Sequence, residues 1–451
     1  MDPAFAQVPL DDLLEGIKAG TYLPTSLALP HDFILIRAEP LLAAIEFNQS
    51  VTHLDLSCNN LGDAIGQKLG NILKNDTILR TVRLKDNTIT EYGFNRFAEA
   101  IVENDTCESL DLSCNFPGEA ALVRLCEALS SSRGLRDLNL AYVKLTEACA
   151  VHLAATLRCE DVRLQHLDVS FNNFGEEGCA VVANALADNI RLLSFDISGN
   201  CMRDKGAGAL AEALKRNRTL EAVRARDNFI KVVGAEALGK ALQENTGLAL
   251  LDLSNNNIWE GGAPEFARGV GAHPALRCLA VRSSNLRMSQ TGPLAAALSV
   301  EGAAPSLTEL DLSVNAIEDV GIGPLCEMLR KHTPLKSLNL RFNGLKDAGA
   351  AQLAGVLALN KTLERLDLQH NGITEAGASR LADALRTNAT LRHLDLARNT
   401  MREGTAELIT ELLQRGRSPE EDIGTPLEEA MRLLERDFGA GPHGGAQAVT
   451  A

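Results

Sequence analysis

Apolar residues recur along the chain in one short pattern, Leu-x-Leu-x-x-Asn-x-Leu, at a spacing of mostly 28 residues. Leu54–Leu61 reads LDLSCNNL, and Leu310–Ile317, Leu366–Ile373 and Leu394–Met401 read LDLSVNAI, LDLQHNGI and LDLARNTM. Two leucines separated by one residue predict a very short strand with both leucines facing inward. A glycine and an Ala/Leu-rich stretch of helical periodicity follow. Strand and helix are therefore expected to alternate along most of the chain.

The asparagine of the pattern marks each unit, and Val143 and Ser284 replace it in two units. A degenerate first unit, Leu27–Ile34, brings the expected number to fourteen. Valine cannot make the hydrogen bonds of asparagine, so the turn at Val143 is expected to be rearranged. One unit is 31 residues long, which predicts an irregular bump at Ser299–Ser306. The motif asparagines are Asn59, Asn87, Asn115, Asn172, Asn200, Asn228, Asn256, Asn315, Asn343, Asn371 and Asn399.

A repeat of this period predicts a solenoid, because no single unit can bury its apolar face without stacking on its neighbours. The repeated LxLxxNxL followed by xxxGxxxLAxxL resembles the leucine-rich repeats of the ribonuclease-inhibitor-like class, over residues 27–415. The resemblance implies an α/β horseshoe of about 14 repeats, with parallel strands on the concave face and helices on the convex face. It also implies protein binding, which is the common role of that class.

The two ends depart from the repeat. Residues 1–26 are expected to form a cap helix, because Leu10, Leu13, Leu14 and Ile17 make an apolar stripe at helical spacing. Residues 416–438 read as a linker and a C-terminal amphipathic helix, which either caps the solenoid or docks a partner or a second copy. Residues 439–451 are a Gly/Ala-rich tail that is expected to be disordered.

Composition narrows the class of protein. Hydrophobic residues make up 45% of the chain and charged residues 23%, and no apolar run approaches the roughly 18 residues that span a bilayer. A net charge of −15 disfavours binding to nucleic acid or to anionic membranes. The first twenty residues lack a basic secretory signal, and the ten cysteines lack metal-ligand spacing. These features predict a cytoplasmic protein in a reducing compartment.

The sequence contains no GxxxxGK[ST] nucleotide-binding motif, no HExxH zinc-protease motif and no GxSxG serine-hydrolase motif, so no catalytic role, no cofactor and no metal are predicted. Six Asn-x-Ser/Thr sequences resemble glycosylation sites. They recur where repeat helices are expected to end, so a helix-capping role is the favoured interpretation. These asparagines are Asn48, Asn75, Asn104, Asn217, Asn360 and Asn388.

Residues that flank the inward leucines are expected to line the concave face. Eight of thirteen residues in the central column are aspartate. These aspartates either bind a basic surface of a partner protein or are simply consensus residues of the repeat. Basic residues interrupt this ladder of aspartates, and they either form a specific docking pattern or balance neighbouring charges. The basic candidates are Arg83, Lys85, Arg224, Arg226 and Arg282, and units near the C-terminus add Arg341 and Arg365.

Trp259, the only tryptophan, lies three residues after Asn256, where other units have polar residues or glycine. It is therefore expected to be exposed at one rim, as a binding hot spot beside Asp252 or as a cover over the next helix start. Phe171 and Phe342 precede the motif asparagine of their units and are further binding candidates.

Together these features predict a non-catalytic scaffold that binds partner proteins through the concave face and rim of the horseshoe. A larger cytoskeletal or ciliary assembly, joined through the C-terminal helix, is compatible with the class. The alternative function is that of a GTPase-activating protein resembling the Ran GTPase activator. That family carries a long acidic C-terminal tail, whereas this chain ends in a neutral one.

Overall fold

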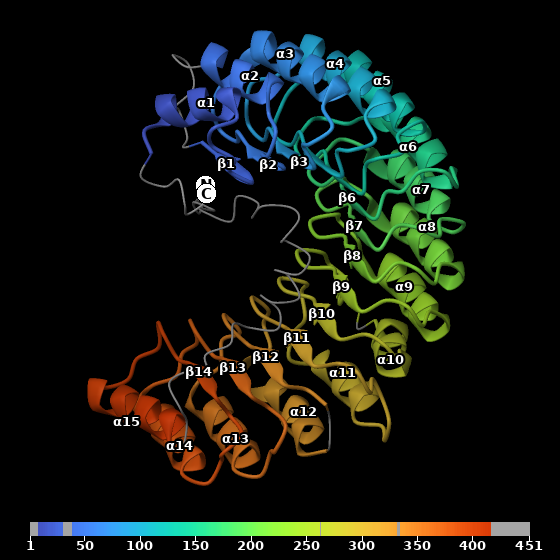
Figure 1. Ribbon diagram of the computed structural model, residues 1–451. Coiled ribbons are helices and arrows are strands. Elements are labelled where there is room, and N and C mark those ends of the chain that lie inside the picture. Colours follow the sequence, from blue (N-terminus) through green and yellow to red (C-terminus); the bar gives the residue numbers. More distant parts are fainter. Residues whose placement is uncertain (1–7, 30–37, 262, 332–333, 416–451) are drawn as a thin grey trace, which may run out of the picture.

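The computed structural model describes residues 8–29, 38–261, 263–331 and 334–415. Strands and helices alternate around an arc, with the strands on its inner side and the helices on its outer side (Figure 1). The described strands form one parallel 14-stranded sheet, ordered from β1 to β14 as in the sequence. The helices α1 and α15 lie on opposite sides of the opening of the arc (Figure 1). The predicted α/β solenoid of fourteen units is thus confirmed.

Each strand is only three residues long. The strands are β1 (Ser26–Ala28), β2 (His53–Asp55), β3 (Thr81–Arg83), β4 (Ser109–Asp111), β5 (Asp137–Asn139), β6 (His166–Asp168), β7 (Ser194–Asp196), β8 (Ala222–Arg224), β9 (Leu250–Asp252), β10 (Cys278–Ala280), β11 (Glu309–Asp311), β12 (Ser337–Asn339), β13 (Arg365–Asp367) and β14 (His393–Asp395).

The helices pack side by side along the outer face. They are α1 (Leu10–Ala19), α2 (Ala38–Glu46), α3 (Gly62–Asn75), α4 (Glu91–Glu103), α5 (Glu119–Leu129), α6 (Glu147–Arg158), α7 (Gly175–Ala185), α8 (Arg203–Arg216), α9 (Val232–Glu244), α10 (Pro264–Ala272), α11 (Thr291–Leu298), α12 (Glu318–Arg330), α13 (Asp347–Leu357), α14 (Glu375–Leu385) and α15 (Glu403–Gln414).

The strands stack in exact repeat register, so equivalent residues form columns. Val223 of β8 pairs with Phe195 of β7 and Leu251 of β9, and all three side chains are fully buried. The apolar faces of the helices meet these columns from the outer side. Because each unit covers the next, the core is continuous along the solenoid.

The motif asparagines form a buried hydrogen-bonded ladder between units. Asn228 is fully buried, and its Nδ2 donates to the carbonyls of Ile197 (2.9 Å) and Arg226 (3.1 Å). Its Oδ1 accepts from the backbone N–H groups of Asn200 (3.0 Å) and Met202 (3.1 Å). The asparagine thus satisfies backbone groups that the short strands leave without partners.

The turn at Val143 is not rearranged, which corrects the prediction. Tyr142 and Lys144 have φ values of 57° and 70°, like equivalent residues of other units. The asparagine of a unit accepts from two backbone N–H groups of the preceding unit, and here one of those two positions is Pro117, which has no N–H. Val143 is therefore tolerated, because one of the two N–H groups that an asparagine would satisfy is absent.

The irregular bump at Ser299–Ser306 is confirmed. Residues 299–306 form turns between α11 and β11, and Val300 is exposed there. Gly302 has a φ of 77°, a backbone conformation that glycine adopts without strain.

A second ladder of asparagines runs along the helix ends. The Nδ2 of Asn217 donates to the carbonyls of Leu186 (2.7 Å) and Asn189 (2.9 Å), and its Oδ1 accepts from Thr219 and Leu220. Asn104, Asn360 and Asn388 make equivalent bonds and are also buried. These four capping asparagines cannot carry a glycan in the folded protein.

At the N-terminal end, α1 packs its Leu13, Leu14 and Ile17 into the core and ends at Gly20, which has a left-handed backbone. The expected C-terminal linker, amphipathic helix and tail, residues 416–451, lie outside the described residues.

Candidate functional site

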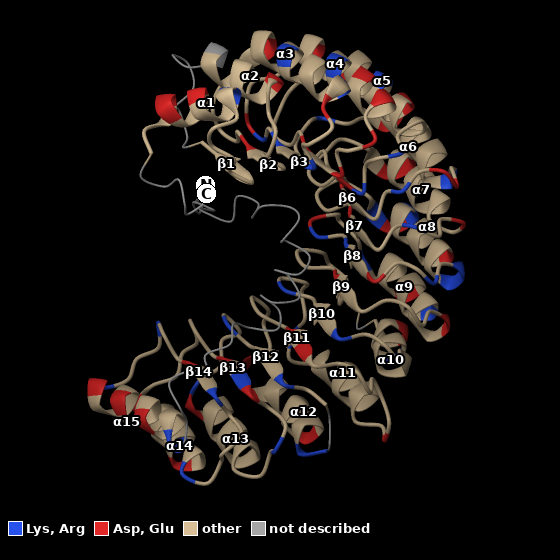
Figure 2. Ribbon diagram, viewed as in Figure 1, with Lys and Arg blue, Asp and Glu red and all other residues tan. Residues whose placement is uncertain are grey.

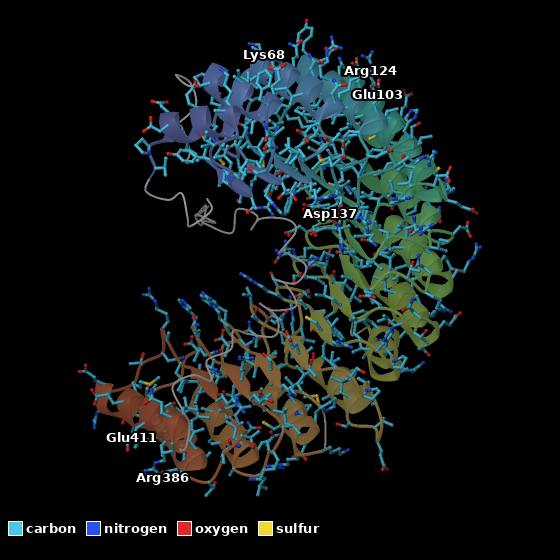
Figure 3. All side chains as sticks on the ribbon, in the orientation of Figure 1. Lys68, Glu103, Arg124, Asp137, Arg386 and Glu411 are labelled. Carbon is cyan, nitrogen blue, oxygen red and sulfur yellow. The ribbon has the colours of Figure 1, made fainter. Side chains whose placement is uncertain are left out.

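The inner face of the arc is built from the residues that alternate with the inward leucines. In β9, for example, Leu251 points into the core, while Leu250 and Asp252 flank it on the inner face. Asp137 of β5 lies on the inner side of the arc, whereas Lys68 and Arg124 lie on its outer side (Figure 3). Acidic and basic residues are interspersed along the convex helices (Figure 2).

The aspartates of the central column have a structural role. The Oδ1 of Asp252 accepts a hydrogen bond from the backbone N–H of Ser254 at 2.9 Å, which fixes the end of the strand. Asn139 and Asn339 make the same bond in their units, so a charge is not needed for it. The interpretation of these aspartates as consensus residues of the repeat is therefore favoured. The same bond is made by Asp55, Asp111, Asp168, Asp196, Asp311, Asp367 and Asp395.

Two of the predicted basic residues pair with neighbouring aspartates. Arg226 lies 3.6 Å from Asp252, and Arg83 lies 4.0 Å from Asp55, in each case between adjacent units. Charge balancing between strands thus accounts for these two arginines. Arg226 is also mostly buried, so it is a weak candidate for a partner contact.

The other basic candidates are distributed around the arc. Lys85 follows β3 and is half-buried, and Arg224 on β8 lies between Asp196 and Asp252 in register. Arg282 follows β10 and is exposed. The structure does not bring these three residues into one cluster.

Aromatic residues form two stacked pairs on the rim where the strands end. The rings of Tyr142 and Phe171 lie 4.5 Å apart at 10°, and those of Phe342 and His370 lie 4.1 Å apart at 11°. The guanidinium of Arg341 lies 5.4 Å from the centre of the Phe342 ring. Phe171 and Phe342, both predicted binding residues, are therefore held in fixed orientations.

These aromatic residues occupy backbone positions that disfavour them. Tyr142, Phe171 and Phe342 have φ values of 57°, 54° and 54°. Bulky residues rarely adopt this left-handed region, whereas glycine and asparagine do so readily. Gly199 and Asn255 occupy the same position in other units. The aromatic side chains are thus not required by the turn, and their presence calls for another reason.

Sequence reasoning missed part of this rim. Phe116 and Phe229 follow the motif asparagine of their units and are 53% and 64% exposed. The ammonium of Lys144 lies 4.8 Å from the centre of the Phe116 ring. A search of the position after the asparagine, in addition to the one before it, would have found both phenylalanines.

Trp259 is fully buried, so the predicted exposure at the rim is wrong. Its ring packs edge-on against Phe266, with ring centres 5.6 Å apart. The reason is a delayed helix start: α9 begins at Val232, four residues after Asn228, whereas α10 begins at Pro264, eight residues after Asn256. The longer loop lets the indole turn into the core. Trp259 therefore cannot contact a partner in the folded protein.

Burial disfavours the ionised form of several aspartates of the ladder, most strongly that of Asp168. Burial raises the pKa of Asp168, and the nearby Asp196 carboxylate raises it further. Because the folded-state pKa exceeds the unfolded value of about 3.9, the folded protein binds the proton more tightly. The contribution of Asp168 to stability is thus fully present at low pH and is lost as the pH rises through its folded pKa.

Asp168→Asn is expected to stabilise the protein at pH 8, by on the order of 1 kcal/mol, and to have little effect near pH 4. Asn139 shows that asparagine preserves the local hydrogen bond. Urea unfolding at both pH values measures the difference. The matched control is Asp395→Asn at the exposed end of the ladder. An equal effect of Asp168→Asn on stability at both pH values would contradict a raised pKa of Asp168 in the folded protein.

The described residues include no group of three or more His, Cys, Asp or Glu side chains placed to hold a metal ion. Across the same residues, no helix has both the length and the apolar character needed to cross a bilayer.

Comparison with known proteins identifies the repeats. A family model described as Leucine Rich repeat matches residues 47–70, 164–183, 189–211, 303–326, 331–354, 359–382 and 387–402. Ribonuclease inhibitor of Sus scrofa is 35% identical over 148 residues, which is 32% of this chain and 32% of that protein. Human NACHT, LRR and PYD domains-containing protein 13 is 33% identical over 147 residues, or 31% of this chain and 13% of that protein.

The matched segment therefore spans about a third of the length of the ribonuclease inhibitor and a smaller part of the NACHT protein. Among solved structures, the TLR13–ssRNA13 complex is 19% identical with a TM-score of 0.46, covering 79% of this chain and 51% of that one.

Proposed function

We propose that this chain, a leucine-rich repeat protein of the ribonuclease-inhibitor-like class, is a non-catalytic scaffold that binds partner proteins through the concave face and rim of its horseshoe. One observation carries the proposal: aromatic side chains lie on one rim, Phe171 half-buried and the others exposed, and Tyr142, Phe171 and Phe229 have left-handed backbone conformations that disfavour bulky residues. Here this rim is called the aromatic rim, and it consists of Phe116, Tyr142, Phe171 and Phe229.

Stacking supports a binding role for the aromatic rim. A ring that is already fixed against a neighbour loses little conformational entropy when a partner covers it. Phe171 is also fixed from its other side, because it lies so close to Gly199 that a Cβ there would come within 2.5 Å of the ring. Aromatic residues that are exposed and immobile are typical of binding hot spots.

The relatives support the same role. One of them is named for the inhibition of ribonuclease, which is an interaction between proteins. All ten cysteines of this chain are free thiols, which suits the reducing environment of the cytoplasm. A cytoskeletal or ciliary assembly is the wider setting that we propose for such a scaffold.

The double substitution Tyr142→Asn and Phe171→Asn is expected to weaken partner binding by at least about tenfold, because it removes two hot-spot side chains. It should leave stability unchanged or slightly higher, since asparagine favours the left-handed backbone. Partners captured from cell lysate by the wild-type chain are identified, and the affinity of each purified partner is then measured for both proteins.

Tyr92→Ala on the convex side is the matched control, because Tyr92 is an exposed aromatic residue of α4. Equal loss of binding in both variants, or none in the rim variant, would remove the aromatic rim from the proposal. The same proteins, assayed for stimulation of GTP hydrolysis by Ran, test the alternative of a GTPase-activating protein.

A further inference from the structure

A second group of aromatic and basic side chains lies on the rim near the C-terminal end of the arc. The group, here called the basic rim, consists of Arg341, Phe342, His370 and Arg398. These residues occupy the two positions before the motif asparagine in the units of β12, β13 and β14, and neither position holds an aspartate or glutamate in those three units. Basic residues lie at loop tips in this part of the arc (Figure 2).

The basic rim is accessible to a partner. The side chain of Phe342 is 44% exposed and Arg398 is exposed. Arg341 and His370 are half-buried. A ligand can therefore reach both guanidinium groups and the ring between them without a change in the fold.

The two arginines of the basic rim have donors to offer a ligand. Arg341 and Arg398 form no ion pair with any residue that the structure describes, whereas Arg226 pairs with an aspartate of the next unit. The field of Arg341 lowers the pKa of Asp367, but burial of that carboxyl outweighs it, and the carboxylate accepts from the backbone N–H of Gln369. A guanidinium carries five N–H donors, so both cations can bind a group from outside the chain.

Stacking holds the basic rim in one arrangement. The rings of Phe342 and His370 lie 4.1 Å apart at 11°, and the guanidinium of Arg341 lies 5.4 Å from the centre of the Phe342 ring. Desolvation lowers the pKa of His370, and the cations of Arg341 and Arg398 lower it further, which places both cations near the imidazole. Side chains held in this way lose little conformational entropy when a partner covers them.

The turns do not require these large side chains. Phe342, His370 and Arg398 have φ values of 54°, 51° and 61°, in the left-handed region that favours glycine and asparagine. Gly199 and Asn255 occupy the same position in other units. Three successive units thus place a large side chain where the local backbone favours a small one, and such departures from local preference are expected at functional sites.

We propose that the basic rim binds an acidic segment of a protein partner, in which two carboxylates meet Arg341 and Arg398 while the residues between them cover the rings. This inference rests on the proposed function, because it names the chemistry of the partner at that rim.

The spacing of the arginines suits acidic residues three positions apart. Adjacent strands lie about 4.8 Å apart, so the units of β12 and β14 are separated by about 10 Å. In the polyproline II conformation, residues three positions apart lie on the same face and are about 9 Å apart. Carboxylates at such positions can each meet one guanidinium, whose planar donors match a carboxylate in pairs.

Charge favours a short acidic peptide over a nucleic acid as the ligand. A nucleic acid carries a negative charge at every phosphate, and the net charge of −15 on this chain opposes its approach. Two carboxylates match the two arginines and bring no further charge near the acidic remainder of the surface.

The test uses the full chain, the capped peptide acetyl-Glu-Pro-Pro-Glu-amide and its neutral counterpart acetyl-Gln-Pro-Pro-Gln-amide. The two prolines favour the polyproline II conformation and supply apolar surface for the rings. Binding is followed by the ring resonances of histidine-labelled protein, and the His370 signal is assigned by its loss in His370→Asn. The test variant is Arg341→Gln with Arg398→Gln. The matched control is Arg124→Gln, since Arg124 is an exposed arginine on the outer side of the arc (Figure 3).

The acidic peptide is expected to move the His370 signal and to bind wild type and Arg124→Gln at least about fivefold more tightly than the double variant, because two exposed ion pairs are lost. Added salt should weaken this binding. Unchanged signals of the other histidines show that the double variant is folded. The inference is overturned if the acidic peptide leaves the His370 signal in place, if the neutral peptide binds as tightly, or if the double variant binds as tightly as wild type.

A thymidine tetranucleotide tests the other class of ligand. Tighter binding of this oligonucleotide than of the acidic peptide, with loss of that binding in the double variant, would assign the basic rim to nucleic acid and overturn the inference.

A captured partner separates this inference from the scaffold proposal. A partner that depends on the aromatic rim but binds the double variant as well as it binds wild type overturns the inference and leaves the scaffold proposal standing. If no protein partner depends on any residue of the concave face or rim, the scaffold proposal fails, while the peptide titration still decides whether the basic rim binds carboxylates.

Discussion

Replacing Trp259 by alanine is expected to lower the free energy of unfolding by about 3–5 kcal/mol, the usual cost of removing a fully buried aromatic side chain. The indole fills the space left by the delayed start of α10 and packs against Phe266. Chemical denaturation followed by circular dichroism measures the change, since the variant lacks the only tryptophan for fluorescence.

Trp259→Phe is the matched control. Phenylalanine keeps an aromatic ring beside Phe266, and it also removes the indole N–H, which is buried without a hydrogen-bond partner. We expect its cost to be below about 1.5 kcal/mol. In the wild type, the fluorescence of Trp259 should be blue-shifted and poorly quenched by acrylamide. Strong quenching in the folded state would contradict the buried placement.

Replacing Asn228 by alanine is the second substitution with a large expected effect, about 3–5 kcal/mol of lost stability. The change leaves the N–H groups of Asn200 and Met202 and the carbonyls of Ile197 and Arg226 without this partner. Each unsatisfied buried group costs roughly 1–3 kcal/mol, and part of that is recovered by relaxation or by a water molecule. Urea unfolding gives the free energy.

Asn257→Ala is the control, because Asn257 is exposed in a neighbouring loop and Ala316 occupies the equivalent position in another unit. A cost below about 0.5 kcal/mol is expected for it. If Asn228→Ala destabilised the chain no more than Asn257→Ala, the asparagine ladder would not be a major source of stability.

The arrangement of strands and helices could be predicted because each unit repeats the same physical solution. An inward Leu-x-Leu pair and a buried asparagine recur, and every strand was found where that pattern predicts it. Trp259 shows the limit of this reasoning. Its equivalents in other units are polar residues or glycine. Its burial depends on the start of α10, which lies four residues later than the start of α9 relative to the motif asparagine, and the identity of residue 259 does not reveal that delay.

A substitution in one unit can be compensated by a residue of the preceding unit, and a single motif does not show this. Val143 replaces a hydrogen-bonding asparagine without disturbing the turn, because Pro117 in the preceding unit has no N–H to be satisfied. The signal is present in the sequence, but it appears only when residues 26 positions apart are compared through the hydrogen-bond pattern.

The candidate site was predicted in part. Phe171 and Phe342 lie on the rim, as their place in the repeat suggested, whereas their stacking on Tyr142 and His370 emerges only from the structure.

The measurement that tests the central claim most directly is hydroxyl-radical footprinting of the chain with and without a captured protein partner. The account predicts that Tyr142, Phe171 and Phe229 on the aromatic rim become protected, while Tyr92 and Val320 on the convex helices remain as reactive as in the free chain. Protection confined to the convex side chains would show that the partner binds the helices, and it would contradict the proposed use of the concave face and rim.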